Sequence, residues 1–137
     1  AGLLDQVGES PLAAAKRELR EETGYTAGTW NVLVDFANSP GGSSEQLRCY
    51  LAQGLVAHPE GRGPLADEEA HMVVEWVALQ EVLEAIAAGR VTNVLLVAGT
   101  LALVAALAEP TLLRPAQAPW PAREHLERAA RVRLPGQ

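Results

Sequence analysis

Three glutamates, Glu18, Glu21 and Glu22, lie within residues 13–25, which read AAAKRELREETGY. If this segment is helical, the three carboxylates fall within about 100° of one another on one side. Glu18 and Glu22 repel each other at a cost of roughly 0.2–0.5 kcal/mol, although Arg17 can reach Glu21. Hard oxygen ligands in this arrangement suit Mg²⁺ or Mn²⁺. A solvated charged face is the alternative that the spacing alone leaves open.

Local signals predict where this helix begins and ends. Ser10 can act as the N-cap, and Pro11 then occupies the first helical position, where its missing N–H costs nothing. Gly24 follows Thr23 as a C-terminal cap residue. The buried stripe of the helix is predicted to consist of Leu12, Ala15 and Leu19.

The segment around this helix, GLLDQVGESPLAAAKRELREETGY, resembles the Nudix box, G-x5-E-x7-R-E-U-x-E-E-x-G-U with U apolar. The matching residues are Glu9, Arg17, Glu18, Leu19, Glu21, Glu22, Gly24 and Tyr25. One departure is that six residues separate Gly2 from Glu9, where the pattern has five. That insertion is similar to a variant found in ADP-ribose pyrophosphatases of actinobacterial type. The resemblance implies the α/β Nudix fold, an α/β/α sandwich with a mixed sheet.

The resemblance also implies roles for residues of the box. Mg²⁺, or Mn²⁺, would be held by Glu18, Glu21, Glu22 and the carbonyl of Ala1. Gly2, Glu9, Arg17 and Gly24 would support the box, with Glu9 and Arg17 orienting the helix and its ligands.

A catalytic base is expected from a later acidic loop, because this is where the family usually supplies one. The segment ADEEAHM, residues 66–72, occupies the corresponding position in this sequence. Glu68 is the first candidate and Glu69 the second, while His71 is interpreted as a surface or packing residue.

A turn-rich loop, NSPGGSSE at residues 38–45, is the expected substrate-binding segment. Pro40 lies sixteen residues after Gly24, as in family members that act on ADP-ribose. Glycines let backbone N–H groups approach a ligand, and the carboxylate of Glu45 can accept a ribose hydroxyl or a metal-bound water. The residues assigned to substrate are Ser39, Pro40, Gly41, Gly42 and Glu45.

The expected reaction is Mg²⁺-dependent hydrolysis of ADP-ribose to AMP and ribose 5-phosphate. Three alternatives stay open: hydrolysis of another nucleoside diphosphate derivative, a Nudix module that binds a nucleotide sugar without cleaving it, and an inactive fragment. The complete set of carboxylates argues against a sensor.

The amino-acid composition limits the kinds of partner and the cellular location that we expect for this protein. A formal charge of −6 over 137 residues argues against a nucleic-acid partner, which needs clustered Lys and Arg. A single cysteine, Cys49, forms no internal disulfide and favours a cytoplasmic location. Residues 91–108 carry no charge, yet their Ala, Gly, Asn and Thr content favours a buried helix over a membrane span.

Hydrophobic periodicity predicts strands over residues 29–36, 46–57 and 72–79, followed by helices over 79–88 and 91–108. Alternation places Trp30, Val32, Val34 and Phe36 on one face of the first strand. Trp30 and Trp76 are expected in the core, with Cys49 as a small buried group.

We therefore expect the chain to consist of two segments: a partial Nudix domain over residues 1–108 and a proline-rich surface tail over 109–137. Trp120 either pins this tail to the domain or contacts a partner subunit. The chain opens at Ala1 without a Met, and strands that precede the box in the family are expected to be lacking. We therefore expect a homodimer and full activity only from a longer chain.

Overall fold

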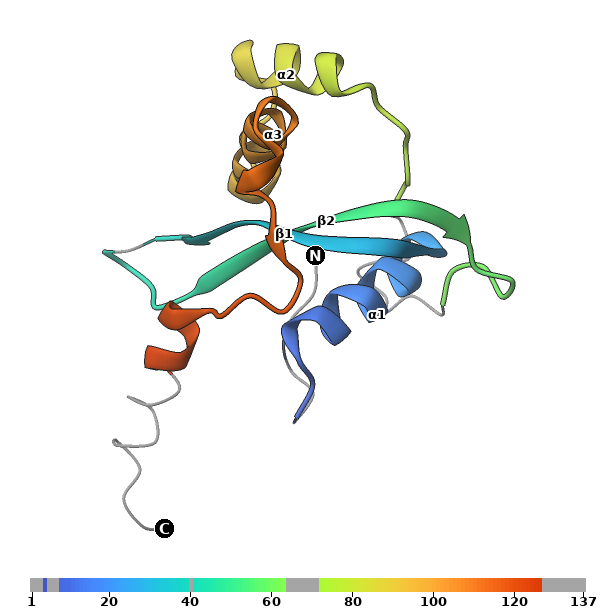
Figure 1. The fold of residues 1–137 in the computed structure, drawn as a ribbon. Coiled ribbons are helices and arrows are strands. Elements are labelled where there is room, and N and C mark those ends of the chain that lie inside the picture. The colour runs from blue at the N-terminus through green and yellow to red at the C-terminus, as the bar shows by residue number, and fades with distance from the viewer. Residues whose placement is uncertain (1–3, 5–7, 40, 64–71, 127–137) are drawn as a thin grey trace.

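The computed structural model describes residues 4, 8–39, 41–63 and 72–126. Its elements, in order, are α1 (Pro11–Thr23), β1 (Tyr25–Ala37), β2 (Gln46–Ala57), α2 (Leu79–Ala87), α3 (Val94–Ala108), the 3-10 turn η1 (Pro110–Leu112) and β3 (Arg114–Pro115). A long β hairpin lies in the middle, with α1 on one face and α3, with α2 beyond it, on the other (Figure 1). This layering agrees with the expected α/β fold.

The hairpin forms because two β-prone segments are joined by turn residues. β1 pairs antiparallel with β2 from Tyr25 opposite Ala57 to Ala37 opposite Gln46. The short β3 pairs antiparallel with the other edge of β1, at Asn31 and Val32. The first two of the three predicted strands are confirmed, although β1 begins before residue 29.

A β-bulge in β1 changes which side chains share a face. Val32 lies opposite Tyr50 but Val34 lies opposite Cys49, so Leu33 is an extra residue without a partner. Directly opposed side chains point to the same side of a sheet, and successive ones point to opposite sides. The prediction that Val32 and Val34 share a face is therefore wrong. Val32 is completely buried.

The predicted third strand, residues 72–79, is wrong. Residues 72–78 have no regular secondary structure, and α2 begins at residue 79. Trp76, expected in the core, has 72% of its surface exposed. Its ring instead meets Tyr25 edge-on, with 5.6 Å between centroids. The sheet order is β2-β1-β3, and in the described residues this segment pairs with neither edge of that sheet, so its β-prone sequence alone does not make it a strand.

The two predicted helices are confirmed, with Gly89 at a positive φ of 69° in the turn after α2. The interpretation of α3 as a buried helix is only partly right. Gly99, Thr100 and Ala106 are buried, whereas Leu107 is 65% exposed. None of the helices in the described ranges is long and apolar enough to cross a membrane.

The close approach of α3 to the sheet depends on a residue without a side chain. A Cβ added to Gly99 would lie 2.8 Å from the sulfur of Cys49 on β2. Cys49 is only half-buried, less than expected, and burial raises the pKa of its thiol.

Candidate active site

Helix α1 is capped as the sequence predicts. The Ser10 hydroxyl accepts a hydrogen bond from the N–H of Ala13 at 3.2 Å, and Pro11 begins the helix. Gly24 adopts the left-handed conformation with φ 75°, and its N–H donates to the carbonyl of Arg20 at 2.8 Å. These caps define the helix that carries all three candidate metal-binding carboxylates.

The buried side of α1 differs from the predicted stripe. Ala14 is the buried residue of the helix, at 4% exposure, whereas Leu12, Ala15 and Leu19 are only half-buried. Ala14 lies one turn before Glu18, so the side of the helix that bears Glu18 faces the protein. As a result the Glu18 side chain is only 16% exposed.

Arg17 is the centre of the acidic cluster. It donates to both carboxylate oxygens of Glu9, through Nε and Nη2, each at 3.1 Å. Its Nη1 donates to Glu18 at 2.5 Å and to Glu21 at 3.0 Å. The hydrogen bonds that Arg17 donates to Glu9 raise the pKa of its guanidinium most, and those to Glu21 and Glu18 add to this against the opposing effect of burial. One cation thus faces three carboxylates, which leaves the cluster negative.

The donor set fits a hard divalent cation, because it consists of carboxylate oxygens on one face of a helix. Glu18 and Glu21 are turned toward Arg17, and within the ranges the structure describes no three acidic, His or Cys side chains surround a common point. An ion bound here would compete with Arg17 for these oxygens. The metal-binding roles of Glu18, Glu21 and Glu22 stay predictions.

Gly24 has a second role that the sequence does not signal. A Cβ on Gly24 would lie 3.0 Å from the backbone nitrogen of Arg62 and 3.1 Å from the carbonyl carbon of Gly61. The N–H of His58 donates to the Gly24 carbonyl at 2.7 Å. The chain that follows β2 therefore packs directly on the C-terminal end of α1.

Several predicted site residues lie outside the described part of the chain. These are Ala1, Gly2, Pro40, Glu68 and Glu69, and His71, interpreted as a surface or packing residue, also lies outside it. Their roles stay predictions. Residues 58–63 and 72–76, on either side of the segment that carries Glu68 and Glu69, are described.

The remaining residues assigned to substrate lie in the hairpin loop. Asn38 donates through Nδ2 to the Glu45 carboxylate at 2.7 Å, and the N–H of Gly42 donates to the Ser39 carbonyl at 2.9 Å. Ser39, Gly41, Gly42 and Glu45 are all exposed. Because β1 has 13 residues, this loop is roughly 40 Å along the strand from Gly24. The structure does not bring the loop and the box carboxylates together.

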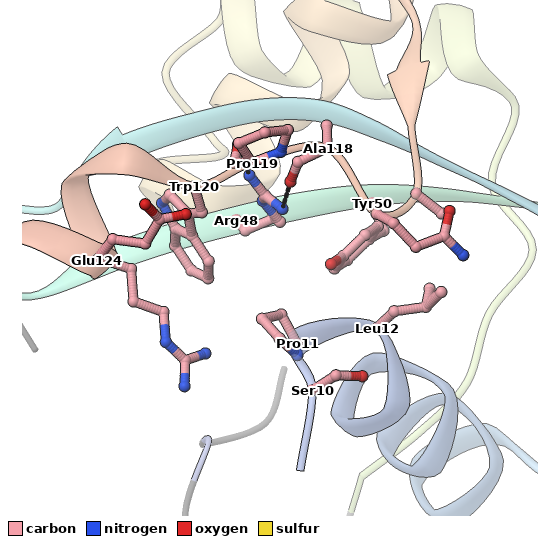
Figure 2. A pocket seen from close by; sticks show the side chains of 12 residues that line it. Ser10, Pro11, Leu12, Arg48, Tyr50, Ala118, Pro119, Trp120 and Glu124 are labelled. Atoms are coloured by element: carbon pink, nitrogen blue, oxygen red, sulfur yellow. Dashed lines mark hydrogen bonds between the residues drawn. The ribbon is translucent and has the colours of Figure 1, made fainter. Parts of the chain in front are cut away.

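A pocket of about 480 Å³ lies where α1 begins, between β2 and the C-terminal segment. Figure 2 shows Pro11 and Leu12 on one side of it and Arg48 and Trp120 on the other, with Tyr50 at one end. The sequence alone did not predict this pocket. A signal was available, since alternation places Arg48 and Tyr50 on the same face of β2.

Arg48 fastens the C-terminal segment to the sheet. Its guanidinium pairs with both oxygens of Asp35, at 2.6 and 2.9 Å, and donates to the carbonyls of Ala118 and Pro119 at 2.8 and 2.9 Å. Its Cζ lies 4.7 Å from the ring centroid of Trp120, which is only 7% exposed. Of the two roles considered for Trp120, the structure thus supports pinning of the tail.

A second cation contacts the same carboxylate, since Nη2 of Arg114 lies 2.9 Å from Oδ2 of Asp35, an oxygen that Arg48 also contacts. Burial on its own raises the pKa of Asp35, but the hydrogen bonds from Arg48 and Arg114 together hold it below its ordinary value. This cluster, with two guanidiniums on one carboxylate, therefore forms a fixed contact between β1, β2 and β3.

Comparison with known proteins agrees with the resemblance of residues 2–25 to the Nudix box. The family model described as "NUDIX domain" matches residues 1–95. The chain is 43% identical over 122 residues to the ADP-ribose pyrophosphatase of Mycobacterium tuberculosis, across 88% of this chain and 57% of the relative. It is 39% identical over 84 residues to the ADP-ribose pyrophosphatase of Bacillus subtilis, across 61% of this chain and 44% of the relative.

A relative with a different named substrate is also similar. The chain is 34% identical over 93 residues to the GDP-mannose pyrophosphatase of Klebsiella pneumoniae, across 68% of this chain and 46% of the relative. The chain spans about half the length of these curated relatives.

Proposed function

Because the chain belongs to the Nudix family, we propose that the protein hydrolyses the pyrophosphate of ADP-ribose to AMP and ribose 5-phosphate. The observation that carries the proposal is the negative cluster on α1, in which Arg17 faces Glu9, Glu18 and Glu21. The relative from M. tuberculosis, named for this activity, is 43% identical across 88% of the chain.

Mg²⁺ is the proposed cofactor, held by Glu18, Glu21 and Glu22 together with the carbonyl of Ala1. When bound, such an ion neutralises the charge of the pyrophosphate oxygens and lowers the pKa of a coordinated water. Glu9 is held by two hydrogen bonds from Arg17, which fix the orientation of that guanidinium toward Glu18 and Glu21. Glu9 and Arg17 therefore orient the ligands in this proposal.

The proposed base is Glu68, with Glu69 as the second candidate. A carboxylate in this segment would accept the proton of the attacking water as its oxygen bonds to phosphorus. The P–O bond to the leaving phosphate then breaks, giving AMP and ribose 5-phosphate. Support comes from the flanks of this segment, because Gly63 lies against Glu21 on α1.

Glu68→Gln should lower kcat on ADP-ribose by about 10²–10⁴, because an amide cannot accept the proton, and should change KM little. Release of AMP by the Mg²⁺-loaded protein measures both constants. Glu81→Gln, on the exposed first turn of α2, is the matched control and should leave both unchanged. If only Glu69→Gln causes this loss, Glu69 is the base. If neither variant causes it, the assignment of the base to this pair is refuted.

Glu22→Gln should weaken Mn²⁺ binding at least tenfold, since it removes a ligand charge and keeps the shape of the side chain. Isothermal titration calorimetry of the protein with Mn²⁺ measures this without substrate. Glu81→Gln again serves as the control. Equal affinity in wild type and Glu22→Gln would remove Glu22 from the metal-binding set.

A second candidate is hydrolysis of another nucleoside diphosphate sugar, favoured by the similarity to a GDP-mannose pyrophosphatase. Comparison of kcat/KM for ADP-ribose and GDP-mannose separates the two. Binding of either compound without release of a nucleoside monophosphate would support a binding module instead.

We further propose that this enzyme is a cytoplasmic homodimer. Apolar side chains that stay exposed in the described ranges, such as Leu107 of α3 and Val73, offer surface for such an association. Sedimentation velocity measures the oligomeric state.

A further inference from the structure

Trp76 is a large aromatic side chain that stays in contact with solvent. Tryptophan is highly buried on average, yet 72% of the Trp76 surface is exposed. Its ring meets that of Tyr25 at an interplanar angle of 86°, with 5.6 Å between centroids, so the two rings are not stacked. At this exposure, at least one flat face of the indole is open to solvent.

The contact with Tyr25 places Trp76 beside the C-terminal end of α1. Gly24 caps that helix, and Tyr25 is the next residue, the first of β1. Three residues separate Glu22 from Tyr25 along the chain, so their Cα atoms are at most about 11 Å apart. The open indole therefore lies near the end of α1 that carries Glu22.

A second link to α1 is independent of the aromatic contact. The carbonyl oxygen of Met72, four residues before Trp76, accepts a hydrogen bond from Nη1 of Arg62 at 2.9 Å. The residue after Arg62 is Gly63, and a Cβ added to Gly63 would lie 3.5 Å from the Cγ of Glu21 on α1. Two separate links thus hold the segment that bears Trp76 beside the acidic end of α1.

An open aromatic face beside a cluster of carboxylates fits a nucleoside diphosphate. Bases stack on aromatic side chains because every base has a flat π-face. In a nucleoside diphosphate one ribose separates the base from the pyrophosphate, so the two groups bind to neighbouring parts of a protein. Glu21 and Glu22 are proposed ligands of the ion that neutralises the pyrophosphate.

We propose that Trp76 is the base-stacking residue for a nucleoside diphosphate substrate: the open face of its indole binds the base while the pyrophosphate lies at the acidic end of α1. This inference rests on the proposed function. Stacking tolerates different bases, so Trp76 contributes affinity for both ADP-ribose and GDP-mannose and does not by itself separate them.

The kinetic test compares Trp76→Ala with wild type on ADP-ribose. Loss of one stacked base should raise KM about tenfold and leave kcat within about twofold, because stacking is the same in the bound substrate and in the transition state. Trp76→Phe keeps an aromatic face and should recover most of the lost affinity. Val73→Ala, at an exposed apolar position of the same segment, is the matched control and should leave KM unchanged. An unchanged KM in Trp76→Ala would overturn the proposal.

A titration without turnover separates stacking from a general structural effect. Calorimetry in Mg²⁺ should show that AMP binds about tenfold more weakly to Trp76→Ala than to wild type. Ribose 5-phosphate lacks the base and should not distinguish the two proteins. Equal AMP affinity in both, or equal weakening for AMP and ribose 5-phosphate, would refute the stacking role.

Tryptophan fluorescence tests where the base lies. A base stacked on an indole quenches its emission, so AMP should quench wild type and Trp30→Phe but not Trp76→Phe. Quenching that persists in Trp76→Phe would place the base elsewhere.

Contact with a partner subunit is the competing role for this surface. Sedimentation velocity tests it, because a dimer that dissociates in Trp76→Ala while AMP affinity stays unchanged would overturn the proposal. A wild-type protein that hydrolyses no nucleoside diphosphate derivative would refute the proposed function, while the AMP titration still reports on Trp76.

Discussion

Two arginine clusters in this molecule have opposite charge balance. Arg17 is one guanidinium among three carboxylates, and its side chain is 22% exposed. Around Asp35, two guanidiniums share one carboxylate, and the Arg48 side chain is only 4% exposed. The Arg48 cluster also satisfies two backbone carbonyls of the C-terminal segment.

The difference indicates what each cluster can do. An excess of carboxylates at a partly exposed position attracts a cation, because the remaining negative charge is only partly screened there. The buried Arg48 already donates through its Nε and both terminal nitrogens to a carboxylate and two backbone carbonyls, so most of its donors hold other segments of the chain. The first cluster is therefore suited to chemistry and the second to holding segments together.

Arg48→Met should break the second cluster with the largest loss of stability. It leaves Asp35 with only Arg114 and leaves two carbonyls without their donor, so the free energy of unfolding should fall by about 3 kcal/mol. Urea unfolding followed by far-UV circular dichroism measures this, with the exposed Arg90→Met as control. A loss below about 1 kcal/mol would show that the C-terminal segment is held by other contacts.

Arg17→Gln should have the opposite effect: a large loss of activity and a small loss of stability. We expect kcat/KM on ADP-ribose to fall about 10- to 100-fold, because residues that orient metal ligands typically contribute this much. Stability should change by only about 1 kcal/mol, as for a partly exposed ion pair. Steady-state kinetics and urea unfolding of the same preparation measure both. Full activity combined with a large loss of stability would erase the distinction between the clusters.

Lowering the pH should have a smaller effect on the free energy of unfolding, through protonation of Asp35. The folded pKa of Asp35 lies below its ordinary value of 3.8, so the contribution of the carboxylate to stability is complete above about pH 3.8. It is lost as the pH falls through the folded pKa. Asp35→Asn removes this contribution at all pH values.

Unfolding free energies of wild type and Asp35→Asn should therefore converge below pH 3.8. Equilibrium unfolding at a series of pH values from about 2.5 to about 6, the range in which carboxylates are protonated, measures the difference at each pH. Glu84→Gln on α2 is the control. A constant difference down to the lowest pH would mean that Asp35 is not the titrating group.

Local features of the sequence predicted α1 and the hairpin correctly. Ser10, Pro11 and Gly24 act on neighbouring backbone groups, so their effect is visible within a few residues. The turn residues of 38–45 and the β-prone segments beside them are equally local. The same spacing predicted that Arg17 would reach Glu21, which the structure confirms at 3.0 Å.

What only the tertiary structure decided involves contacts between distant segments. The bulge at Leu33 places Asp35 on the face of β2 that bears Arg48, and no pattern within β1 predicts that extra residue. Arg48 reaches carbonyls 70 and 71 residues away. Trp76 stays exposed although its segment reads as a strand. Spacing along the chain determines which side chains can share a helix face, whereas the partner of a strand or a buried charge depends on how separate segments pack.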